Sequence, residues 1–132
     1  MSAQVTLTVT DLRSQKNRYR FTEHTWCVVG RGDDCDIQLP HDGLHADVSR
    51  HHCLFEIDPP SVRVRDLGSR NGTYVNEDLI GQRPRDCPPE EVDSQPSPMH
   101  ELKHGDEIRV GHVNVQVEVS VATDVLQPMY FS

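Results

Sequence analysis

The sequence predicts an all-β protein, an antiparallel β-sandwich or barrel built from many short strands. In several stretches apolar residues alternate with polar ones, which is the period-two pattern of strands with one buried face. No stretch shows the sustained 3.6-residue apolar stripe of an amphipathic helix. Turn-forming Pro-Pro, Asn-Gly and Gly-Asp pairs divide the chain at short intervals, as expected where hairpins join neighbouring strands.

The first and last predicted strands have the clearest alternation. Apolar residues alternate with threonines from Val5 to Val9, and valines alternate with mostly polar residues from Val113 to Val121. Shorter β-prone runs between them predict further strands at Tyr19 to Phe21, Thr25 to Val29, Ile37 to Leu39, Cys53 to Ile57, Val62 to Val64, Thr73 to Val75 and Glu107 to Val110.

Two segments interrupt this series of strands. Residues 82–100 contain five of the nine prolines together with several acidic residues. Such a composition cannot bury enough apolar surface to offset its ordering entropy, so we expect a mobile, acidic surface loop there. The second interruption, Pro40 to Asp47, is rich in histidine and aspartate and precedes the segment that begins at Ser49.

Length and charge set limits on the class of protein. A chain of 132 residues fits one domain spanning 1–132. The net charge of -8 disfavours nucleic acid and anionic membranes as partners. Without a secretory signal or a spanning apolar run, we expect a soluble cytoplasmic protein. Its four cysteines, Cys27, Cys35, Cys53 and Cys87, are then expected to be reduced.

Three polar clusters lie next to predicted strands: Gly30-Arg31, Ser49 to His52, and Gly68 to Thr73 followed by Asn76. In a β-sandwich these positions are loops at the sheet ends, where side chains from distant parts of the sequence can converge. Guanidinium, hydroxyl and amide groups together suit a phosphate monoester, which carries about -1.5 to -2 charges at pH 7. They do not suit a nucleophilic enzyme.

The order and spacing of these clusters resemble a known family. The run GR…CDIQL…VSRHHCLF…VRVRDLGSRNGTYVN is similar to the forkhead-associated (FHA) domain, a phosphothreonine-binding β-sandwich of about eleven strands. The similarity extends from about Val28 to Asn76, and Leu102 to Val121 resembles the closing strands of the family. The resemblance implies a non-catalytic adaptor that binds phosphothreonine-containing proteins, either substrates of a Ser/Thr kinase or a kinase itself. We expect a monomer.

The resemblance also assigns roles to individual residues. It implies that the phosphate is bound by Arg31, Ser49, Arg50 and Arg70, and that Asn71 binds the peptide backbone. It implies structural support of the site by Gly30, His52, Gly72 and Asn76. Gly72 has an independent rationale, because an Asn-Gly pair supplies the positive φ of a tight turn.

Two departures from the family pattern concern the ligand preference. Glu77-Asp78 follows Asn76 where a glycine is common, and the Pro40 to Asp47 loop is longer than usual. In the family this loop often helps select a residue after the phosphothreonine. Acidic residues within it, Asp42 and Asp47, would favour a basic ligand residue.

Other interpretations of the same residues exist. The domain could bind an unmodified partner, or cysteines and histidines could form a metal- or redox-responsive site. We expect neither catalysis, nor a cofactor, nor a metal, because the sequence has no G-x-S-x-G elbow and no C-x₂-C zinc spacing. Arg31 could simply form solvated ion pairs with neighbouring aspartates. Trp26 is expected in the core.

Overall fold

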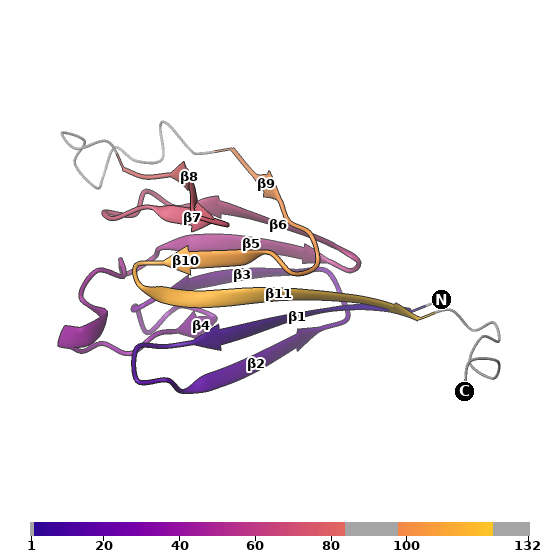
Figure 1. Cartoon of the computed structure of the whole chain (residues 1–132), viewed down its shortest axis with the longest axis horizontal. Coiled ribbons are helices and arrows are strands. Elements are labelled where there is room, and N and C mark those ends of the chain that lie inside the picture. Colours follow the sequence, from indigo (N-terminus) through magenta and orange to yellow (C-terminus); the bar gives the residue numbers. More distant parts are fainter. Residues whose placement is uncertain (1, 84–97, 123–132) are drawn as a thin grey trace.

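The computed structural model describes residues 2–83 and 98–122, which form two β-sheets (Figure 1). The six-stranded sheet has the order β2 (Lys16–Phe21), β1 (Ser2–Thr10), β11 (Val113–Ala122), β10 (Glu107–Val110), β7 (Thr73–Val75) and β8 (Asp78–Gly81). The five-stranded sheet has the order β4 (Ile37–Gln38), β3 (Thr25–Gly30), β5 (Cys53–Asp58), β6 (Ser61–Asp66) and β9 (His100–Glu101). Between β4 and β5 a single 3₁₀ turn, η1, spans Gly43–His45.

The predicted all-β sandwich is confirmed, and each predicted strand is present. One pair departs from the antiparallel rule, because β3 and β4 run parallel and pair Val29 with Ile37. The sequence did not predict β8 or β9. Both residues of β9 are exposed, and β8 is only partly buried, so neither has a buried face that would produce an apolar alternation.

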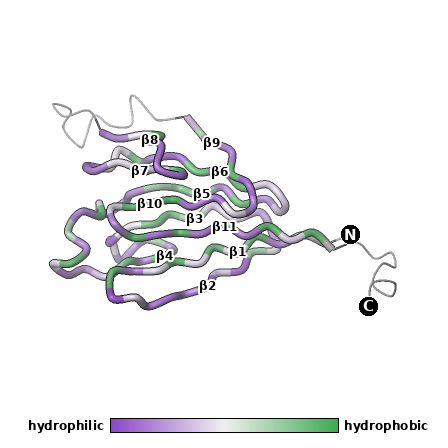
Figure 2. The backbone as a smooth tube through the Cα atoms, viewed as in Figure 1, coloured by the Kyte–Doolittle hydropathy of each residue, from purple (hydrophilic) through white to green (hydrophobic). Residues whose placement is uncertain are grey.

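The core lies between the two sheets. Inward-facing residues of β1, β3, β5, β10 and β11 alternate with outward-facing ones, and the inward residues Val5, Leu7, Phe55, Ile108 and Val115 have no exposed surface. The edge strand β2 is mostly hydrophilic (Figure 2). Its only residues packed against the core are the partly buried Tyr19 and Phe21. Because the core fixes the strands on both sides of it, the loops at the strand ends start from a rigid scaffold.

Trp26 is 53% exposed and not in the core, because it points outward from β3 opposite Glu56 of β5. Most of the proline-rich segment predicted at residues 82–100 lies outside the described residues. Within residues 2–83 and 98–122, no helix has the length and apolar character that crossing a membrane requires.

Candidate functional site

Residues 47–49 form the centre of the site, because they are hydrogen-bonded to both neighbouring loops. On one side the backbone N–H of Arg31 donates to the Ser49 carbonyl at 3.1 Å, and Arg31 Nε donates to the Val48 carbonyl at 2.5 Å. On the other side the N–H of Arg70 donates to Ser49 Oγ at 3.0 Å. Asn71 Nδ2 donates to the Asp47 carbonyl, also at 3.0 Å. The three predicted clusters thus meet at one place.

The approach of the first two loops requires glycine at position 30. A Cβ on Gly30 would lie 2.1 Å from the Arg50 carbonyl oxygen and 2.9 Å from the Ser49 carbonyl oxygen. Real Cβ atoms do not approach backbone oxygens this closely, so any larger residue would push the loops apart. Gly30 therefore fixes the position of Arg31 relative to Ser49.

His52 connects the Ser49 loop to the third loop from beneath. Its side chain is fully buried; Nδ1 accepts a hydrogen bond from the Ser49 N–H at 3.0 Å, and Nε2 lies 2.8 Å from the Gly72 carbonyl. Since Nδ1 accepts, the ring proton is on Nε2 and is donated to Gly72. Burial lowers the pKa of His52 below its ordinary value, which keeps this neutral tautomer.

Asp66, which the sequence analysis did not select, organises the third loop. Its carboxylate is 2% exposed and accepts hydrogen bonds from the N–H groups of Gly68 and Ser69, both at 2.8 Å. It also accepts from the hydroxyl of Thr73 at 2.7 Å and from that of Ser69. An aspartate side chain that accepts from N–H groups two and three residues later forms an Asx-type turn. The sequence Asp66 to Ser69 therefore contained a local signal for this turn.

Gly72 and Asn76 both have positive φ, at 91° and 49°, but they act in different places. Gly72 lies in the loop of Arg70 and Asn71. Asn76 instead ties the β7–β8 turn to β10: its Nδ2 donates to Asp106 Oδ1 and its Oδ1 accepts from the Glu107 N–H, each at 3.0 Å. Glu77, where the family often has glycine, adopts the left-handed φ of 74° that glycine favours.

The arginines of the site have no carboxylate partners among the described residues. None of the ion pairs between residues of 2–83 and 98–122 includes Arg31, Arg50 or Arg70. The expected alternative, ion pairing of Arg31 with nearby aspartates, is therefore not what the structure shows. Asp34 instead contacts His51, and Asp36 accepts from the Val28 N–H at 2.9 Å.

Arg50 is bonded through its backbone to the loop that follows β3. Its carbonyl accepts from the Gly32 N–H at 3.0 Å, and its Cγ is near Gly32. Its side chain is exposed. No hydrogen bond between the described residues joins the Arg50 guanidinium to Ser49 or Arg70.

The two acidic residues of the longer loop already have partners. Asp42 accepts from the buried His45 at 2.7 Å and pairs with Arg13 at 2.9 Å, while Asp47 contacts His112. The pKa of Asp42 is lowered by its hydrogen bond from His45. Both carboxylates therefore already use part of their hydrogen-bonding capacity within the protein.

The chain is similar in sequence to one family of known proteins. The family model of the FHA domain matches residues 27–111. FhaA of Mycobacterium tuberculosis, an FHA domain-containing protein, is 32% identical over 92 residues, which are 70% of this chain and 14% of FhaA. The glycogen accumulation regulator GarA of Mycolicibacterium smegmatis is 36% identical over 83 residues, 63% of this chain and 39% of GarA. The chain thus spans well under half the length of either relative.

Solved structures agree with the sequence comparison. A structure from an analysis of phosphothreonine-dependent FHA domain interactions is 30% identical, with a TM-score of 0.61 over 87% of this chain and 95% of the other. The FhaA FHA domain in complex with the intracellular domain of Rv3910 is also 30% identical, with a TM-score of 0.60 over 86% of this chain and 99% of the other.

Proposed function

The chain belongs to the FHA domain family, and from this membership we propose that it binds phosphothreonine-containing segments of partner proteins at the loops of Arg31, Ser49 and Asn71. The observation that supports this most directly is the convergence of these loops on residues 47–49. No ion pair within residues 2–83 and 98–122 includes Arg31 or Arg70, so no carboxylate of that part of the chain competes with a phosphate for them.

The proposed contacts follow from what each group can offer. Arg31 uses Nε for the Val48 carbonyl, which orients the guanidinium and leaves its two terminal nitrogens for phosphate oxygens. The hydroxyl of Ser49 accepts a hydrogen bond from the backbone N–H of Arg70 and can donate its own proton to the phosphate. The exposed cations of Arg50 and Arg70 add attraction at the edge of the site.

Asn71 is suited to read the peptide backbone next to the phosphothreonine. One hydrogen of its amide is donated to the Asp47 carbonyl, which fixes the plane of the group. The second amide hydrogen and the carbonyl oxygen can then pair with one N–H and one C=O of an extended ligand. Such a pair of contacts would set the direction of the bound peptide.

The relatives support a recognition module without catalysis. The FhaA FHA domain has been crystallised with the intracellular domain of another protein, and a second similar domain belongs to a study of phosphothreonine-dependent interactions. We extend this to the present chain as a cytoplasmic, monomeric adaptor in Ser/Thr-kinase-linked signalling. Its partner would be a kinase or a substrate of one, with neither nucleic acid nor membrane involved.

A titration with a degenerate phosphothreonine peptide library tests this function. Matched libraries that carry phosphoserine or unmodified threonine serve as controls. We expect binding that requires the phosphate, with a preference for phosphothreonine over phosphoserine if the γ-methyl is buried, worth on the order of 1 kcal/mol. Equal binding of the phosphorylated and unmodified libraries would instead favour a phospho-independent scaffold.

A further inference from the structure

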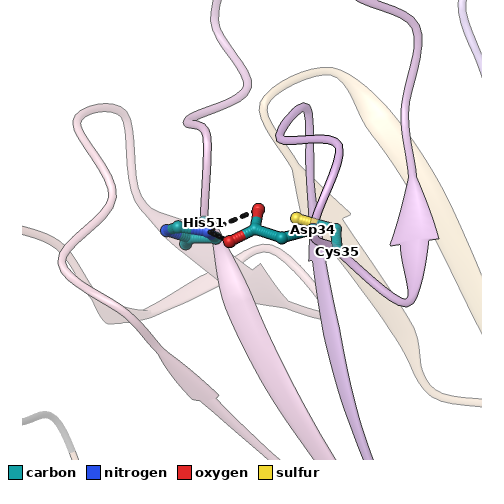
Figure 3. Close-up of side chains that lie close together, drawn as sticks. All are labelled: Asp34, Cys35 and His51. Carbon is teal, nitrogen blue, oxygen red and sulfur yellow. Dashed lines mark hydrogen bonds and ion pairs between the residues drawn. The ribbon is translucent and has the colours of Figure 1, made fainter.

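Three side chains that commonly bind metals meet beside the proposed phosphopeptide loops (Figure 3). Asp34 and Cys35 come from the β3–β4 loop and His51 from the residues just before β5. A carboxylate oxygen, the thiol sulfur and an imidazole nitrogen lie within 4.8 Å of one another. No other group of three such side chains is found among residues 2–83 and 98–122.

The three side chains are accessible but held close together. His51 Nε2 lies 2.9 Å from both carboxylate oxygens of Asp34, and the two side chains are 44% and 59% exposed. The thiol of Cys35 donates to the Arg50 carbonyl at 3.1 Å and is partly exposed. Among the described cysteines it is the accessible one, since Cys27 and Cys53 are buried.

The backbone beneath these side chains is firmly connected. The Arg50 carbonyl accepts from the Gly32 N–H at 3.0 Å as well as from Cys35, and the Cys35 N–H donates to the Gly32 carbonyl at 3.1 Å. The loop of Asp34 and Cys35 is thereby joined to the residue that precedes His51. Closing the three donor atoms around an ion thus requires side-chain rotation and little movement of the backbone.

We propose that Asp34, Cys35 and His51 bind one Zn²⁺ ion. A carboxylate oxygen, a thiolate and an imidazole are the ligand types that zinc takes, at roughly 2.0–2.3 Å, and a water would complete the tetrahedron. On binding, the Cys35 S–H bond breaks, a Zn–S bond forms and the proton passes to solvent. His51 moves its ring proton from Nε2 to Nδ1 by exchange with solvent, so that Nε2 can bind the ion.

The surrounding charges favour a cation. The negative charges of Asp34 and Asp36 act on the Cys35 thiol, and the positive charge of Arg50 acts against them. The pKa of the Cys35 thiol is raised, mainly by burial, so zinc must compete with the thiol proton. No metal was expected from the sequence, because it has no C-x₂-C zinc spacing. Positions 34, 35 and 51 match none of the usual zinc spacings either.

Zinc binding to the full chain under reducing conditions tests the proposal, without any phosphopeptide. The titration uses Zn²⁺ against a chromophoric competitor, followed by Co²⁺ substitution to detect the thiolate-to-metal absorption band. Two variants remove a ligand but keep a hydrogen-bonding group: Cys35→Ser, whose hydroxyl can still donate to Arg50, and His51→Gln. A Cys87→Ser background removes the cysteine that lies outside the described residues.

The matched control is His24→Gln. The His24 side chain is as exposed as that of His51 and also lies 2.9 Å from a carboxylate, that of the largely buried Glu56, but the pair belongs to no three-ligand group. We expect one zinc per chain, an affinity at least about tenfold weaker in Cys35→Ser and His51→Gln, and a change of less than about twofold in His24→Gln. The cobalt band should disappear in Cys35→Ser.

Two results would overturn the zinc site. One is the absence of binding at zinc concentrations comparable with that of the protein. The other is an affinity that is unchanged in Cys35→Ser or equally reduced in His24→Gln. Circular dichroism of each variant without zinc shows whether it is folded, and if Cys35→Ser is not, His51→Gln decides the question. Neither result depends on phosphopeptide binding, so the proposed function is tested separately.

Discussion

At the scale of the residue, the proposed phosphate ligands are positioned mainly by backbone groups. The Val48 carbonyl orients the side chain of Arg31, and the Asp47 carbonyl orients that of Asn71. The hydroxyl of Ser49 is oriented by the backbone N–H of Arg70. A side chain held in this way loses little further freedom when a ligand binds, which lowers the entropic cost of association. The site therefore depends on the exact path of residues 47–49.

Replacing Ser49 by alanine tests one of these contacts. Ser49→Ala removes the hydroxyl proton proposed to bind the phosphate, so we expect phosphopeptide affinity to fall by at least about tenfold, roughly 1.4 kcal/mol. The melting temperature should change little, because the Arg70 N–H it bonds belongs to an exposed residue that water can reach. Ser61→Ala, an exposed serine at the start of β6, is the control. Isothermal titration calorimetry measures both affinities.

His52 gives the protein a pH-dependent stability. Burial lowers its folded pKa, so below about pH 6.5 the unfolded chain takes up a proton that the folded protein does not. The free energy of unfolding should therefore fall on acidification below about pH 6.5 and should be unaffected by this group at higher pH. Urea unfolding at about pH 5.5 and about pH 7.5 measures this. The same pH change should have a smaller effect in His52→Gln, and an equal effect would contradict the assignment.

At the scale of the element, strands with one buried face could be predicted and exposed ones could not. Alternation located β1 and β11 because alternate residues are buried from Val5 to Val9 and from Val113 to Val117. The turn chemistry of Asn71-Gly72 located the third loop. The strands β8 and β9 were missed because their pairing is supported by backbone hydrogen bonds at an exposed edge. Trp26 was misplaced because an isolated aromatic residue does not reveal which face of a strand it occupies.

The candidate site was also only partly predictable. Arg31, Ser49 and Asn71 could be selected because their motifs keep the order of a known family. Asp66 was overlooked although its turn with Gly68 and Ser69 is local in the sequence. The Asp34, Cys35 and His51 cluster could not be predicted, because it depends on a contact between two loops. Proximity across sequence separations of 15 residues or more follows from sheet register, which alternation alone does not determine.

At Gly30 the end of β3 lies directly against the backbone of Ser49 and Arg50. Gly30→Ala places a Cβ 2.1 Å from the Arg50 carbonyl oxygen, so β3 and the Ser49 segment must separate. We expect a loss of at least about 2 kcal/mol in the free energy of unfolding, together with weaker phosphopeptide binding. Gly43→Ala is the matched control, because a Cβ there meets nothing within 4 Å, and should change stability by less than about 0.5 kcal/mol. Denaturant unfolding distinguishes the two, and equal stability of both variants would contradict the close approach.

At the scale of the whole molecule, an acidic protein is proposed to bind an anion. The net charge of -8 would repel a phosphopeptide at long range, while the proposed ligands Arg31, Arg50 and Arg70 would attract it at short range. Salt screens both effects, and at about 0.1 M it already screens charges more than about 10 Å apart. The selectivity for phosphate must therefore come from direct contacts.

Opposing contributions of this kind predict a weak salt dependence. Between about 50 mM and about 500 mM NaCl we expect phosphopeptide affinity to fall by less than about tenfold, because the loss of local attraction is offset by reduced repulsion from the rest of the protein. Calorimetric titrations at several ionic strengths measure the slope. A steep loss, as for a protein that binds through a broad basic surface, would contradict this balance.

The central claim is that Arg31 reads the phosphate, and one comparison tests it most directly. The affinity of a single phosphothreonine peptide is measured for the wild type, Arg31→Ala and Arg18→Ala. Arg18 is an exposed cation on β2, so its removal changes the net charge equally without touching the site. We predict at least about tenfold weaker binding for Arg31→Ala alone, about 1.4 kcal/mol. Equal affinities for all three proteins would contradict the proposed site.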